Sequence, residues 1–187
     1  MSREVVLVRH GETEWSRSGQ HTGTTDLPLL PEGEAQAREV APRLAGREFA
    51  LVLCSPMQRA RRTAELAGFG DRAEPDADLK ERDYGVYEGR TTKEIRVEHP
   101  GWDVWRDDCP GGETLEQLAA RADRVIERVL AADGDTLIFA HSHLLRELAG
   151  RWIGLAPDGG GKLRLGTATL STLGFERERR VILTWNA

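Results

Sequence analysis

Short apolar runs, several rich in β-branched residues, alternate along the chain with longer segments of helical character. The apolar runs predict strands at about residues 4–9, 49–54, 136–140, 169–175 and 181–185. The longer segments predict helices at about residues 32–44, 56–67, 113–131 and 142–153. Continuous apolar runs of four to eight residues are typical of strands buried on both faces of a parallel sheet.

The order of these elements predicts the fold class. Strands and helices alternate from residue 4 to 67 and again from 113 to 153, which is the order of β-α-β units. A short charged turn at residues 176–180 joins the last two strands and indicates an edge hairpin. We therefore expect a three-layer α-β-α fold of the α/β class. Its central sheet is mostly parallel, helices cover both faces, and the hairpin forms the C-terminal edge.

Length, net charge and cysteine content limit the classes of function that the chain can have. The 187 residues suit one domain, spanning 1–187. A net charge of -5 argues against a general nucleic-acid or membrane binder, so an anionic ligand would need a local basic pocket. The two cysteines, Cys54 and Cys109, fit neither a disulfide framework nor a metal-binding spacing. Without a signal-peptide pattern or a membrane-length apolar segment, the cytoplasm is the expected location.

Two predicted strands are each followed by a histidine. His10 comes after the first strand and Arg9, and His141 comes after the run at 136–140. Ligands of open α/β sheets bind beyond the carboxyl ends of the strands, so we expect both histidines and Arg9 to share one site. A nucleophilic histidine beside a fixed cation indicates phosphate chemistry. From the residues alone the two histidines are nearly equivalent nucleophiles, and Gly11 favours His10 by allowing close backbone approach.

Two predicted helices also begin at this edge of the sheet. Pro56 opens the first, with Ser55 as N-cap, and Arg59 then lies on a face from which it can reach the pocket of Arg9. Ser142 opens the helix after His141, so its backbone N–H should point at a bound anion.

Residues 7–15, LVRHGETEW, resemble the signature of the histidine phosphatase superfamily, the phosphoglycerate mutase-like group. Further matches follow in order: SPMQRARRTA at 55–64, LKERDYGVYEG at 79–89 and AHSH at 140–143. The resemblance spans nearly the whole chain. It implies the fold described above and phosphate transfer through a phosphohistidine, without a metal or other cofactor.

The resemblance assigns roles to individual residues. It implies that His10 attacks phosphorus in line and that Arg59 binds the transferred phosphate, while Arg9 and His141 also neutralise the equatorial oxygens. Glu81 holds the place of the family's general acid.

Other carboxylates surround these positions. From the residues alone, Glu81 is as readily a solvated loop carboxylate in an acidic neighbourhood. Glu12 and Glu14 are expected to be structural, and Glu12 is a candidate to orient the His10 ring or nearby backbone.

Substrate contacts are also implied by the resemblance. Ser16 replaces an asparagine that many members use to hold phosphate, and Ser142 replaces the usual glycine. The full set of implied substrate-binding residues is Ser16, Gln20, Thr22, Gly23 and Ser142. His143 is expected to point away from His141 and to pack, as is His99.

The segment 90–140 contains no cluster of adjacent arginines and is short, which favours a phosphatase over a mutase. Residues 102–109, WDVWRDDC, together with 15–23, look closest to small bacterial acid phosphatases and the sedoheptulose-1,7-bisphosphatase-like branch. We expect a metal-independent phosphomonoesterase of the acid phosphatase type, a monomer or homodimer, acting on sugar phosphates or other small phosphorylated metabolites. The alternatives are a cofactor-dependent phosphoglycerate mutase and a non-catalytic phospho-ligand binding module. A metal-dependent phosphatase would need an Asp and His cluster, which the sequence does not display.

Overall fold

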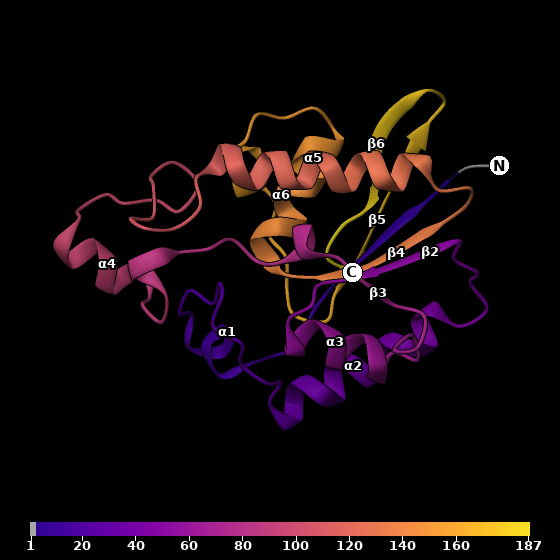
Figure 1. Cartoon of the computed structure of the whole chain (residues 1–187), viewed down its shortest axis with the longest axis horizontal. Coiled ribbons are helices and arrows are strands. Elements are labelled where there is room, and N and C mark those ends of the chain that lie inside the picture. The colour runs from indigo at the N-terminus through magenta and orange to yellow at the C-terminus, as the bar shows by residue number, and fades with distance from the viewer. Residues whose placement is uncertain (1–2) are drawn as a thin grey trace.

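A six-stranded sheet lies between two layers of helices in the computed structural model, which describes residues 3–187 (Figure 1). The strand order is β3-β2-β4-β1-β5-β6, in which the first four strands are parallel and the last two form an antiparallel hairpin at one edge. The strands are β1 (Val5–Arg9), β2 (Leu51–Cys54), β3 (Glu74–Pro75), β4 (Thr136–Ala140), β5 (Leu170–Glu176) and β6 (Arg179–Thr184). The predicted α/β class, mostly parallel sheet and edge hairpin are confirmed.

The longer helices cover both faces of the sheet (Figure 1). Helices α5 and α6 cover one face, and α2 and α3 cover the other, while α1 and α4 lie beyond the carboxyl ends of the parallel strands. The helices are α1 (Glu14–Ser18), α2 (Pro31–Leu44), α3 (Gln58–Leu66), α4 (Thr92–Glu98), α5 (Leu115–Ala131) and α6 (Ser142–Trp152). Three-residue or four-residue 3-10 turns lie at Ala77–Leu79, Gly85–Tyr87 and Gly159–Lys162.

Each face of the sheet has its own apolar core. Val5 and Leu7 of β1 pack among residues of α5 and α6, whereas Val6 and Val8 pack among residues of α2 and α3. Successive side chains of a strand point to opposite faces, so a strand covered on both sides needs apolar residues at every position. This is why the first apolar run of the sequence is continuous.

Three short elements are not predicted by the sequence pattern: α1, β3 and α4. They have five, two and seven residues, which is too short for a hydrophobic period to show. For α4 a signal does exist in the sequence, because Thr91 and Glu94 form a capping box in which each side chain accepts the other's backbone N–H.

The predicted start of the helix at Pro56 is wrong by two residues. Helix α3 begins at Gln58, with Met57 at the N-cap position and no side-chain cap. The hydroxyl of Ser55 instead lies 2.7 Å from Nε2 of His141 and accepts the N–H of Met57 at 3.3 Å. Ser55 is therefore a residue of the histidine site.

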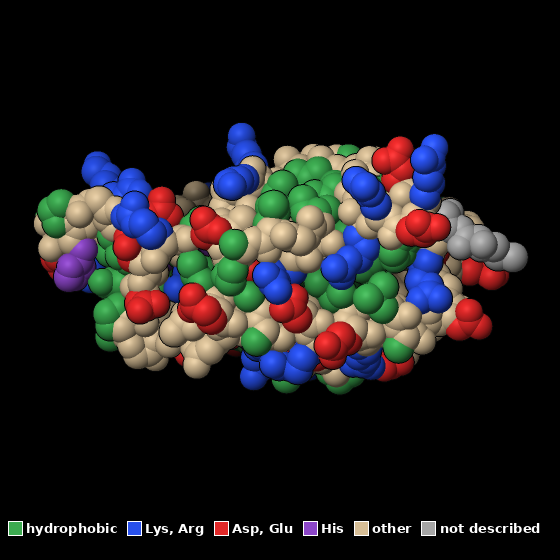
Figure 2. Space-filling model, turned by 90° about the horizontal axis from the view of Figure 1, so that it is seen from above, with side chains coloured by type: hydrophobic (Ala, Val, Ile, Leu, Met, Phe, Trp, Pro, Cys, Tyr) green, Lys and Arg blue, Asp and Glu red, His purple; other side chains and the backbone are tan. Residues whose placement is uncertain are grey.

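Basic and acidic side chains are interspersed over the face formed by α5 and α6, with no continuous basic area on that face (Figure 2). Part of this pattern comes from ion pairs, such as Arg124 with Asp78 at 2.6 Å and Arg128 with Asp76 at 2.9 Å. Within residues 3–187, none of the helices combines the length and the apolar character needed to cross a membrane.

Glu147 of α6 is fully buried, and neither carboxylate oxygen has a hydrogen-bond partner among residues 3–187. Burial raises the pKa of Glu147 to about 8; Arg151 opposes this rise, and Asp123 adds to it. The pKa in the folded protein thus lies above the ordinary value of 4.5. Protonation of Glu147 therefore favours the folded state.

This carboxyl should make the protein lose stability as the pH rises. The stabilisation is fully present below the unfolded-state pKa, and it is lost as the pH rises through the folded-state pKa of about 8. We expect Glu147→Gln to flatten this dependence and to raise the free energy of unfolding at about pH 9 by on the order of 2 kcal/mol. Urea unfolding between about pH 5 and pH 9 measures the effect. Glu127→Gln, at an exposed position of α5, is the control and should change neither quantity; parallel curves for wild type and Glu147→Gln would contradict the prediction.

Candidate active site

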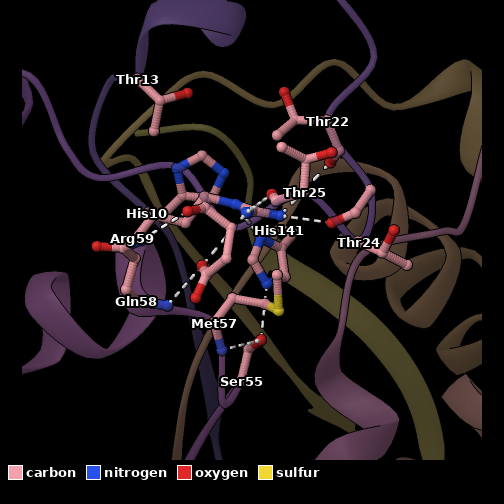
Figure 3. A network of polar contacts seen from close by, with 12 residues as sticks. His10, Thr13, Thr22, Thr24, Thr25, Ser55, Met57, Gln58, Arg59 and His141 are labelled. Carbon is pink, nitrogen blue, oxygen red and sulfur yellow. Dashed lines mark hydrogen bonds and ion pairs between the residues drawn. The ribbon is translucent and has the colours of Figure 1, made fainter. Parts of the chain in front are cut away.

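The carboxyl ends of β1 and β4 bring His10 and His141 together. These strands are parallel neighbours, with Arg9 opposite Ala140 in the register, and each histidine is the next residue. The two ring centroids are 5.1 Å apart. His10 is 5% exposed and His141 is fully buried. The two histidines therefore meet in one enclosed site (Figure 3).

The hydrogen bond of His10 determines which ring nitrogen can react. Its Nδ1 lies 2.7 Å from the carbonyl oxygen of Gly11. A carbonyl oxygen only accepts, so Nδ1 carries the proton and donates it. Burial is the main cause that holds the pKa of His10 well below its ordinary value, and the charges of Arg9 and Arg59 lower it further. The ring is therefore neutral, and its Nε2 has the free lone pair that a nucleophile needs.

Both ring nitrogens of His141 have protein partners. Nε of Arg59 donates to Nδ1 of His141 at 3.1 Å, so Nδ1 is the accepting nitrogen. The proton is then on Nε2, which donates to the Ser55 hydroxyl at 2.7 Å. Burial, followed by Arg59 and His10, keeps the pKa of His141 well below its ordinary value. Both nitrogens of a neutral His141 are thus engaged, one of them by Arg59, and its implied share in neutralising the phosphate stays a prediction.

Arg59 lies between His10 and a loop of threonines at residues 22–25 (Figure 3). Its side chain is fully buried, and its guanidinium donates to the carbonyl oxygens of Thr25 at 2.9 Å and Gly23 at 3.0 Å. One turn further along α3, the Thr63 hydroxyl accepts the N–H of Gly11 at 3.1 Å. The face of α3 that the sequence predicts to face the site thus does so.

Arg9 offers an unused donor. Its Nη1 donates to the carbonyl oxygen of Leu165 at 2.6 Å. Its Nε is buried and has no hydrogen-bond partner among residues 3–187. A guanidinium N–H of this kind is suited to donate to an anionic group.

Glu81 is held at the N-terminus of α6. Its Oε1 accepts the N–H groups of Arg82 and Leu144, both at 3.0 Å, and its Oε2 accepts the N–H of His143 at 3.0 Å. The residue is 7% exposed to solvent. The alternative of a solvated loop carboxylate is therefore wrong, because α6 begins directly after His141 and fixes Glu81 beside the histidine site.

Several residues that the resemblance implies as substrate contacts form hydrogen bonds within the protein. The Ser16 hydroxyl accepts the N–H of Thr13 at 2.8 Å and donates to its carbonyl oxygen at 3.0 Å, which caps α1. Gln20 donates from Nε2 to the carbonyl oxygen of Gly89 at 2.6 Å. The carbonyl groups of Thr22 and Gly23 face the Arg59 guanidinium. Contact of these residues, and of the Ser142 N–H, with substrate stays a prediction.

Two residues of the loop after β1 contact neighbouring segments. Gly11 allows a close backbone approach, here to the carbonyl group of Gly33 in α2, with which a Cβ would collide. The Glu12 carboxylate pairs with Arg17 at 2.6 Å and does not orient the His10 ring. That orientation comes from the carbonyl oxygen of Gly11.

His143 also lies at the site, contrary to the expectation that it only packs. Its Nδ1 is 3.9 Å from Oε2 of Glu81 and 2.6 Å from the Tyr84 hydroxyl. The expectation assumed helical spacing from His141, but His141 is the N-cap and has extended backbone angles. Trp105 lies against the His143 ring, with centroids 4.9 Å apart, and Arg146 lies over Trp105 at 4.6 Å. Arg146 follows His143 by three residues in α6, so the two lie on the same face of the helix. This spacing alone could have placed Arg146 near His143.

A cavity of about 580 Å³ is lined by Gly23 and Glu81. Met57 and Arg121 also line it, as do residues of α5. Within residues 3–187, no three His, Cys, Asp or Glu side chains lie together in a way that could hold a metal ion.

The arrangement is that of a phosphate-transfer site, and comparison with known proteins places it in a family. A family model described as histidine phosphatase superfamily, branch 1, matches residues 5–187. The chain belongs to the histidine phosphatase superfamily. The resemblance predicted from the sequence motifs is thereby confirmed, and the match begins at the first residue of β1.

This histidine phosphatase is 39% identical over 180 residues to an acid phosphatase of Mycobacterium tuberculosis, covering 94% of this chain and 88% of that protein. It is also 39% identical over 188 residues to the sedoheptulose 1,7-bisphosphatase of Saccharomyces cerevisiae, covering 83% of this chain and 69% of the yeast protein. The solved structure of the open reading frame Rv3214 from Mycobacterium tuberculosis superposes with a TM-score of 0.91 at 36% identity, covering 98% and 97% of the two chains. The two curated relatives are named as phosphatases, and the Rv3214 structure has the same fold as this chain.

Proposed function

We propose that this histidine phosphatase hydrolyses phosphate monoesters of small metabolites, with sugar phosphates as the first substrate class, through a phosphohistidine on His10. One observation carries the proposal. His10 presents a neutral ring with an unprotonated Nε2 in an enclosed site, close to the buried guanidinium of Arg59. Arg9 adds a buried Nε that has no hydrogen-bond partner within residues 3–187. The relatives named as an acid phosphatase and a sugar bisphosphatase support the substrate class.

The reaction runs in two steps. Nε2 of His10 attacks phosphorus, the N–P bond forms, and the bond to the leaving oxygen breaks as Glu81 gives that oxygen its proton. The proton on Nδ1 of His10 stays there throughout and is donated in a hydrogen bond to the Gly11 carbonyl oxygen. Water then attacks phosphorus, Glu81 takes one of its protons, and the N–P bond breaks. Phosphate and the alcohol are released, and both side chains return to their starting forms.

Charge stabilisation comes from the two arginines. The equatorial oxygens of the transferred group carry negative charge, and donors already aimed at that position lower the barrier. Arg59 is held in place by His141 and by the carbonyl groups of Thr25 and Gly23, so it need not reorganise when the phosphate arrives. In this proposal Arg9 and Arg59 stabilise the negative charge of the transferred group, and His141 orients Arg59.

The proposal has further parts. We infer a single domain over 1–187, a monomer or homodimer, a cytoplasmic location, and small phosphorylated metabolites as the partners, with neither nucleic acid nor membrane among them. The reaction needs no metal, because the two guanidinium groups supply the positive charge that a metal ion would otherwise provide.

A screen of phosphorylated metabolites tests the function. We expect inorganic phosphate to be released from sugar phosphates at the same rate with and without a metal chelator. With 3-phosphoglycerate and a bisphosphoglycerate primer, mutase turnover should be slower than hydrolysis of the best sugar phosphate. Activity that the chelator removes and magnesium restores would contradict the metal-free reaction. Mutase turnover faster than all hydrolysis would replace the phosphatase with a phosphoglycerate mutase, and no turnover of either kind would indicate a binding module.

A further inference from the structure

The hydrogen bonds to Glu81 are unequal at its two oxygens. Oε1 accepts two backbone N–H groups, from Arg82 and Leu144, which occupy both of its lone pairs. Within residues 3–187, Oε2 accepts one backbone N–H, from His143. One lone pair of Oε2 is therefore left, and it is the position at which this carboxyl can hold the proton for the leaving group.

The imidazole of His143 lies beside that same oxygen. Its Nδ1 is 3.9 Å from Oε2, close enough to restrict the carboxyl and too far for a hydrogen bond. Burial, followed by Arg146 and His21, holds the pKa of His143 well below its ordinary value, so the ring is neutral. The neutral ring therefore limits the positions open to the Glu81 carboxyl group and does not form an ion pair with it.

The His143 ring is itself fixed from two sides. The Tyr84 hydroxyl forms a 2.6 Å hydrogen bond with Nδ1, and Tyr84 is 1% exposed. Burial raises the pKa of Tyr84 well above its ordinary value, so this is a bond between two neutral groups. The Trp105 ring packs against the imidazole with an interplanar angle of 33°. Two buried or half-buried aromatic residues thus hold a ring whose edge faces Glu81.

We propose that His143, fixed by Tyr84, is a positioning residue for proton transfer to the leaving group: it keeps Oε2 of Glu81 in the orientation from which the proton is delivered. The inference rests on the proposed function, in which Glu81 is the acid. Small misplacements of a catalytic group can cost about 10²-fold in rate. Loss of the His143 ring should therefore slow only reactions in which the leaving group needs the proton from Glu81.

The test compares two leaving groups in the complete chain. His143→Leu removes the polar ring, and Tyr84→Phe removes only the hydroxyl that fixes it. We expect each to slow phosphorylation of His10 by glycerol phosphate by about 10- to 100-fold, and by p-nitrophenyl phosphate by less than about 3-fold, because p-nitrophenolate leaves without a proton. Rapid-quench kinetics on both substrates measure these rates.

Two further variants separate positioning from packing. His143→Asn places an amide near the former Nδ1, and it should restore most of the glycerol phosphate rate. His99→Leu is the matched control: His99 is exposed, its ring faces Tyr87 and not Glu81, and both rates should stay unchanged. Tyr84→Phe keeps the aromatic ring, so the test stands even if His143→Leu does not fold.

Equal losses on both substrates, or no loss on either, would overturn the positioning role. The Glu81→Gln variant shows whether the proposed function fails with it. If Glu81→Gln is selective for glycerol phosphate and the His143 and Tyr84 variants are not, only the positioning role is overturned. If Glu81→Gln is not selective either, the assignment of the acid is wrong and the positioning role falls with it.

Discussion

His10→Ala should abolish turnover, with a loss of about 10⁴-fold or more, because it removes the nucleophile of a two-step reaction. Acid-labile phosphate should be trapped on denatured wild-type protein during turnover and should be absent from His10→Ala. The reason lies in the hydrogen bonds: of the two site histidines, His10 has the nitrogen whose lone pair is free. Rapid acid or denaturant quench with labelled substrate measures both rate and trapped label.

His141→Ala is the control for the choice of nucleophile. It removes the acceptor for Nε of Arg59 and the donor to Ser55, so phosphorylation should slow while the label stays on His10. Peptide mapping of the labelled protein locates the phosphate. A label on His141 would show that the nucleophile is assigned to the wrong residue.

Glu81→Gln should slow hydrolysis of alkyl phosphates by about 10²- to 10⁴-fold, the usual contribution of a general acid. The penalty should be much smaller on p-nitrophenyl phosphate, whose leaving group departs with little proton assistance. The variant keeps an amide oxygen that can accept the N–H groups of Arg82 and Leu144. The rate of His10 phosphorylation by each substrate, measured before the steady state, gives the comparison.

Glu14→Gln is the matched control, because Glu14 is an exposed carboxylate of α1 and should contribute to neither rate. Equal losses on both substrates would mean that Glu81 only shapes the pocket. The acid would then have to be sought among Glu12, Glu14 and Asp83. The structure makes these weaker candidates, since Glu12 pairs with Arg17 and Asp83 accepts the N–H of Gly85 at 2.8 Å.

The pattern of apolar residues predicts the buried strands of the sheet and the edge at which the two histidines lie, although it misses the two-residue β3. The strands at β1 and β4 could be predicted because burial on both faces requires continuous apolar runs, which are visible in a linear pattern. A histidine directly after each run had to lie at the carboxyl edge of the sheet. The motifs around His10, Arg59, Glu81 and His141 then indicate the family.

The chemical differences between the groups at the site depend on contacts that form only in the folded chain. The two histidines look equivalent in sequence, and the difference between them comes from the partners of their nitrogens: a carbonyl oxygen for His10, and Arg59 with Ser55 for His141. Likewise, the capping of α6 by Glu81 joins residues more than 60 positions apart. Hydrogen-bond partners that distant leave no periodic signal in the chain, because they are set by how loops pack against helix ends and not by local sequence spacing.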